Sequence, residues 1–114
     1  MHIMRTITSY KVREAIRRTV RVGRPKKVIV FGSYINEEIK SGSGLDILVI
    51  SEDSIPDTRA ESTRIRRHLR DLMIPINILV VRESDYEVLK HRPGLIYREI
   101  EDTGIVVYES GKWN

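Results

Sequence analysis

The sequence of 114 residues contains no cysteine, and it has no long hydrophobic run. The absence of cysteine excludes a disulfide framework and any cysteine-ligated metal site, and it is compatible with a reducing compartment. No apolar run approaches the roughly 20 residues that cross a bilayer, and the first ten residues lack the apolar stretch of a signal peptide. We therefore expect a cytoplasmic protein with no membrane segment.

Aromatic residues and histidines are also scarce. The chain has one Trp, one Phe and five Tyr, so it offers few rings on which nucleic-acid bases could stack. The three histidines, at positions 2, 68 and 91, show no metal-ligand spacing, which argues against a zinc site. With 40% apolar residues over this length, we expect one globular domain spanning residues 1–114.

Positive charge is concentrated near the N-terminus. The first 30 residues hold nine Lys or Arg against Glu14 alone, a balance of +8, whereas the rest of the chain sums to −4. Ser9–Val22 has apolar residues at helical spacing, which predicts an amphipathic helix with a cationic face. That face is either solvated or a footprint for RNA, and RNA is the less favoured partner. If RNA binds there, neutralising Arg17, Arg18 and Arg21 should abolish the binding.

The order of apolar runs and turn signals predicts an alternation of strands and helices. We expect an α/β (α+β) fold in which a mixed sheet of about four strands is flanked by helices. Strands are predicted at Val28–Phe31, Leu45–Ile50, Met73–Val81 and Ile105–Tyr108. Further helices are predicted at Tyr34–Lys40, from Ser54-Ile55-Pro56-Asp57 onward, at Glu83–Lys90, and over a segment that ends at Thr103-Gly104.

The stretch Val28–Ile50 has the layout of an anion site. Gly32 and Ser33 follow a buried type of strand, so the next backbone N–H groups lie at a helix N-terminus, where a phosphate could bind. A Gly/Ser turn then leads to Asp46 at the start of the next strand.

These residues resemble the signature of the DNA polymerase β-type nucleotidyltransferases, in particular their minimal nucleotidyltransferase branch. The pattern in that family is Gly-Ser, about ten residues, Ser-Asp-x-Asp, an apolar strand, and a third Asp on a later strand. The resemblance implies a nucleotidyltransferase fold that moves a nucleoside monophosphate from ATP or another NTP to a hydroxyl, with Mg²⁺ as cofactor. Gly32, Ser33 and Ser43 would then bind the nucleotide, and Asp46 would hold the metal.

The sequence departs from this pattern at two of three carboxylates. Gly44 stands where the first Asp is expected, and Asn77 stands where the third is expected, so Asp46 and Asn77 are the catalytic candidates that remain. One carboxylate instead of three predicts weakly bound Mg²⁺ and weak or lost transfer. Replacing Gly44 and Asn77 by Asp should raise Mg²⁺-dependent ATP binding if the geometry survives. The other acids that would take over as ligands, if the fold brings them to the site, are Glu37, Glu38, Glu52, Asp53 and Glu83.

Three functions stay open on this reasoning, the weakest being direct RNA binding by the two Arg-rich helices. The first is a nucleotidyltransferase, and the second is a non-catalytic nucleotide-binding or antitoxin-like subunit. The resemblance implies a helical HEPN-type protein as the partner in the second case, and a homo-oligomer is a further alternative. The sequence does not specify the acceptor or the base.

Overall fold

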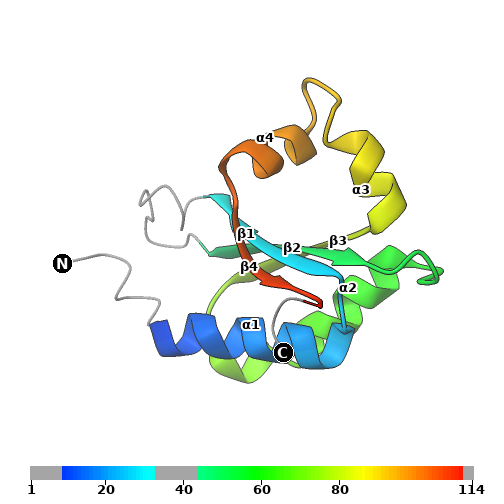
Figure 1. Ribbon diagram of the computed structural model, residues 1–114. Helices are drawn as coiled ribbons and strands as arrows, with labels where there is room; N and C mark the ends of the chain where they lie inside the picture. The colour runs from blue at the N-terminus through cyan, green and yellow to red at the C-terminus, as the bar shows by residue number, and fades with distance from the viewer. Residues whose placement is uncertain (1–8, 33–43, 112–114) are drawn as a thin grey trace.

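The computed structural model describes residues 9–32 and 44–111. These residues form a four-stranded mixed sheet with helices on both faces (Figure 1). The strand order is β3-β2-β1-β4, where β1 pairs antiparallel with β2 and β4, and β2 pairs parallel with β3. This arrangement confirms the predicted fold class. The strands are β1 (Lys27–Phe31), β2 (Leu45–Ser51), β3 (Ile76–Arg82) and β4 (Ile105–Glu109).

The helices form two layers, one on each face of the sheet (Figure 1). One layer contains the long N-terminal helix and a second helix that continues into a short 3₁₀ turn. The other layer contains two short helices near the C-terminus. The first layer consists of α1 (Ser9–Gly23), α2 (Thr58–Arg67) and η3 (Arg70–Leu72), and the second of α3 (Glu83–Leu89) and α4 (Ile96–Thr103). The predicted helix at Tyr34–Lys40 lies outside the described residues.

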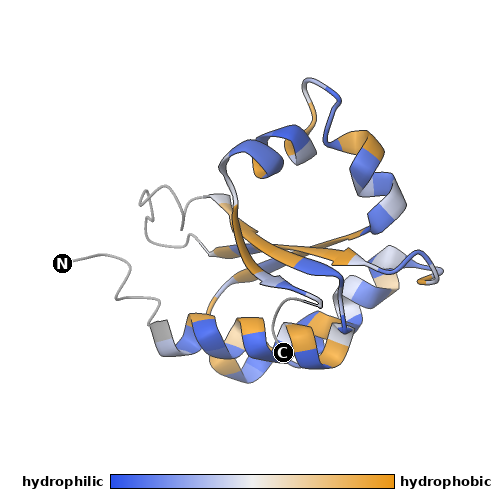
Figure 2. Ribbon diagram, viewed as in Figure 1, coloured by the Kyte–Doolittle hydropathy of each residue, from blue (hydrophilic) through white to orange (hydrophobic). Residues whose placement is uncertain are grey.

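Each layer buries its own hydrophobic core against the sheet, as the apolar strands between mixed helices show (Figure 2). Side chains alternate between the two faces along a strand. In β2, Leu45 and Ile47 therefore pack toward α1 and α2, whereas Leu48 packs toward α3 and α4. The same alternation places Asp46 on the face of α3 and α4.

Two predicted boundaries were wrong, and local backbone contacts explain both. Helix α2 begins after Asp57, because the Asp57 side chain accepts a hydrogen bond from the backbone N–H of Ala60 at 3.0 Å and so caps the helix. The predicted start at Ser54 is three residues too early. Strand β3 begins at Ile76 and not at Met73, because Met73 ends η3 with a left-handed φ of 59°.

The layer of α3 and α4 is held together by Tyr86. Its ring is buried, and its hydroxyl donates a hydrogen bond to Glu101 Oε1 at 2.6 Å, which joins the two helices. Tyr97 meets the Tyr86 ring edge-on, with ring centroids 6.3 Å apart. Burial, followed by the hydrogen bond with Glu101, raises the pKa of Tyr86.

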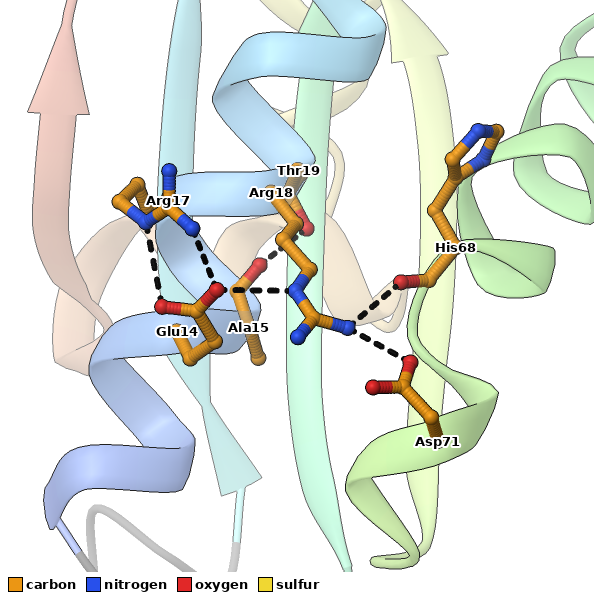
Figure 3. A network of polar contacts seen from close by, with 7 residues as sticks. All are labelled: Glu14, Ala15, Arg17, Arg18, Thr19, His68 and Asp71. Carbon is orange, nitrogen blue, oxygen red and sulfur yellow. Dashed lines mark hydrogen bonds and ion pairs between the residues drawn. The ribbon is translucent and has the colours of Figure 1, made fainter.

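An arginine network fastens α1 to η3 (Figure 3). Arg18 donates to Glu14 at 3.0 Å, to Asp71 at 2.7 Å and to the backbone carbonyl of His68 at 3.1 Å. Arg17 also pairs with Glu14. Two of the arginines on the predicted cationic helix face therefore already form ion pairs with other residues of the chain.

This network predicts a loss of stability in acid. Hydrogen bonds from Arg17 and Arg18 lower the pKa of Glu14 from 4.5 to about 2. Because the folded pKa lies below the unfolded one, the stabilisation is present above pH 4.5 and disappears as the pH falls toward about 2. Glu14→Gln should therefore lower the urea midpoint at pH 6, and the difference from wild type should vanish near pH 2. Glu52→Gln, at an exposed position, is the control, and an unchanged midpoint for Glu14→Gln at pH 6 would contradict the prediction.

Candidate functional site

Asp46 and Asn77 lie side by side at the start of the two parallel strands. They are partners in the register of β2 and β3, and Asn77 Nδ2 donates a hydrogen bond to Asp46 Oδ1 at 2.8 Å. Asn77 is exposed and Asp46 is half-buried, so this corner of the sheet is open to ligands. The structure thus brings together the two predicted catalytic candidates.

Gly32 approaches the same carboxylate from the other side. Its neighbour Phe31 is the partner of Asp46 in the pairing of β1 with β2. Gly32 has a φ of +83°, and a Cβ placed on it would lie 2.3 Å from Asp46 Oδ2. Both its conformation and this close contact require glycine. Gly32 and Asp46 therefore converge in space, as the resemblance implies for a nucleotide site.

Gly44 is constrained by a different contact. A Cβ at this position would lie 2.5 Å from the carbonyl oxygen of Pro75 and 2.9 Å from its carbonyl carbon. The same oxygen accepts a hydrogen bond from the backbone N–H of Leu45 at 2.9 Å, which fixes the two segments together. Because the clash is with backbone, an aspartate does not fit at position 44 in this structure. The predicted gain from replacing Gly44 by Asp required the geometry to survive, and this contact means that the backbone would have to shift at position 44.

The other predicted ligands do not complete the set. Glu52, Asp53 and Glu83 lie beyond the far ends of β2 and β3, and six strand residues at about 3.3 Å each place them roughly 20 Å from Asp46. There Asp53 accepts a hydrogen bond from the backbone N–H of Ser84 at 3.0 Å. The remaining predicted residues, Ser33, Glu37, Glu38 and Ser43, lie outside the described part of the chain.

The described residues do not fit a centre for two Mg²⁺ ions. Over residues 9–32 and 44–111, no group of three or more His, Cys, Asp or Glu could hold a metal ion. Asp46 supplies one carboxylate, and one of its oxygens already accepts the Asn77 amide. Asn77 can offer only a neutral carbonyl oxygen and cannot act as a base. Chemically, the corner is a single-carboxylate site next to a glycine turn.

Residues 14–112 match the family described as "Polymerase beta, Nucleotidyltransferase", so the chain belongs to the DNA polymerase β-type nucleotidyltransferases. Its fold resembles the 1.40 Å crystal structure of a protein from Sulfolobus solfataricus assigned as a nucleotidyltransferase. The TM-score is 0.60 at 12% sequence identity, and the match covers 90% of this chain and 81% of the other. At this identity the likeness shows the shared fold. No curated protein matches the chain.

Sequence reasoning missed Pro75, although the residue sets the geometry at Gly44. Its only signal in the sequence is its place directly before β3, a position where proline is tolerated. As for membrane insertion, none of the described helices has the length and apolar character needed to cross a bilayer.

The contact at Gly44 predicts that even one added methyl group is costly there. Gly44→Ala should lower the free energy of unfolding by about 1–3 kcal/mol, because the backbone of Pro75 cannot move away without disturbing the β2–β3 pairing. Urea denaturation would measure the change. Gly23→Ala is the matched control, since the nearest atom there, at 3.1 Å, is the terminal Cδ1 methyl of the Ile65 side chain and not backbone. Equal stability of Gly44→Ala and wild type would contradict the prediction.

Proposed function

We propose that this domain binds a nucleoside triphosphate at the corner formed by Gly32, Asp46 and Asn77, and that it transfers the nucleotidyl group weakly or not at all. The observation that carries the proposal is the hydrogen bond from Asn77 to Asp46, in the position where the family pattern has two facing carboxylates. The nucleotidyltransferase family to which the chain belongs supports the choice of ligand.

Open access supports nucleotide binding at this corner. Asn77 is exposed, and α3 follows β3 at the opposite end of the strand from Asn77. Phe31, the partner of Asp46 in β1, is half-buried and packs against the core of α3 and α4, so it borders the corner on the β1 side. The Gly32 conformation turns the backbone sharply next to Asp46. A phosphate chain could approach the backbone closely at such a turn.

We expect weak transfer because the site has too little negative charge. Nucleotidyl transfer depends on positioning and on neutralising the charge that develops on the phosphate oxygens. A pair of opposite charges 4 Å apart is worth about 4 kcal/mol at an effective dielectric constant of 20, and each 1.4 kcal/mol of barrier is a factor of about ten in rate. With Gly44 closed to any side chain and Asn77 neutral, the described site lacks two such charges. The expected rate is therefore lower by several powers of ten.

The proposal predicts that one carboxylate added opposite Asp46 strengthens binding. Asn77→Asp should raise the affinity for Mg²⁺-ATP about tenfold, because it places a second acid in register with Asp46. Isothermal titration calorimetry with and without Mg²⁺ would measure the effect. Ser54→Asp adds the same charge at an exposed site past the far end of β2 and should change nothing. Tighter binding by both variants, or by neither, would contradict the assignment of the site.

Transfer itself is tested with α-labelled ATP, Mg²⁺ or Mn²⁺, and candidate protein and hydroxyl acceptors. The wild-type chain should give little or no labelled product. Substantial turnover that is lost in Asp46→Ala would overturn the view that transfer is weak, while leaving nucleotide binding at this corner intact.

A further inference from the structure

The sheet separates two layers of opposite charge. Residues 9–26 and 57–73, which form α1, α2, η3 and their ends, hold twelve Arg or Lys and four Asp or Glu, a balance of +8. Residues 83–103, which form α3 and α4, hold three Arg or Lys and six Asp or Glu, a balance of −3. One face of the molecule is thus strongly cationic.

The acids of the basic layer are all engaged. Glu14 and Asp71 pair with the arginine network of α1 (Figure 3). Glu61 accepts two hydrogen bonds from Arg64, at 2.8 and 2.9 Å, and Asp57 caps α2. Arg17, Arg18 and Arg64 therefore have carboxylate partners, and the free positive charge of this layer lies on other arginines.

Three of these arginines line one groove. Arg66, Arg67 and Arg70 are exposed, and within the described chain their side chains make no ion pair or hydrogen bond. The groove has a volume of about 370 Å³ and lies between the α2–η3 segment and the start of β3. Its apolar lining comes from Leu69, Ile74 and Ile76.

Guanidinium groups bind phosphate through two parallel N–H donors, which makes arginine the residue best suited to phosphate recognition. More exposed arginines without side-chain partners in the described chain, Arg21, Arg24 and Arg59, lie on the same layer, so the cationic surface extends beyond the groove. This extent favours a long polyanion over a single phosphate. None of the described residues that line the groove is aromatic, although aromatic residues are typical of protein interfaces and of base stacking.

We propose that this groove binds the phosphodiester backbone of a single nucleic acid strand without sequence preference, through Arg66, Arg67 and Arg70. The proposal is independent of the nucleotide site, because Asp46 and Asn77 lie on the opposite face of the sheet. Arg17 and Arg18, the arginines named for the less favoured RNA contact, are engaged by Glu14, so the arginines of the second Arg-rich helix are the better candidates.

The test is fluorescence anisotropy with a labelled single-stranded RNA and a DNA of the same sequence. Wild type should bind both with a non-specific Kd of about 10⁻⁴–10⁻⁶ M near physiological salt. Three phosphate contacts on a single strand predict a slope of log K against log salt of about −2, so the affinity should fall about 20-fold between 50 and 200 mM salt. In the variant with Arg66→Gln, Arg67→Gln and Arg70→Gln, binding at 50 mM salt should weaken at least tenfold and the slope should become much shallower.

The control variant combines Arg13→Gln, Arg92→Gln and Arg98→Gln, which removes the same charge from exposed positions outside the groove and should bind nearly as wild type. Because all six side chains are exposed, both variants should keep the wild-type urea midpoint. Equal weakening in the two variants would overturn the proposal, as would no detectable binding by wild type at 100 µM protein. Competition by poly-glutamate as effective as that by RNA would also overturn it, in favour of an acidic protein partner.

Discussion

The close approach of Pro75 to Gly44 is the constraint on which the site depends. The Pro75 carbonyl accepts from Leu45 N–H at 2.9 Å, and the parallel ladder of β2 and β3 runs on from there. This start fixes the register that places Asn77 opposite Asp46. The same contact leaves no room for a Cβ at position 44. One backbone interaction therefore both assembles the surviving pair of polar residues and excludes the carboxylate that the family pattern has beside them.

Each of the two carboxylate oxygens of Asp46 has a neighbour that the register of β2 with β1 and β3 brings to it. Asn77 donates to one carboxylate oxygen, and the Cα of Gly32 lies against the other. In a site with three carboxylates, mutual repulsion would have to be offset by cations, whereas here an amide donor and a glycine turn accommodate a single charge. The loss of two acids is thus matched by local contacts that suit the one that remains.

Much of the fold could be predicted from the sequence, because β-branched runs and turn residues act locally. All four strands and the glycine turn at Gly32 follow from such patterns. Contacts between distant segments could not be predicted. The residues next to Gly44 in the sequence predict only a flexible turn. The reason that position 44 must be glycine is its contact with a segment about thirty residues away. In the same way, the sequence places Arg18 only on a cationic helix face. The packing of α1 on η3 brings Asp71 to it, and the sequence alone does not show this contact.

The alternation of side chains along β3 separates the two surfaces proposed to bind ligands. Ile76 lines the arginine groove on the face of α1 and α2, and the next residue, Asn77, meets Asp46 on the other face. A shift of one residue in the register of β3 would exchange these faces, turning the Asn77 amide into the core beside α1 and α2 and moving Ile78 and Val80 out of that core. The hydrophobic core therefore enforces the separation, because it makes any other register costly. Two anionic ligands, one on each face, could then bind without competing for the same residues.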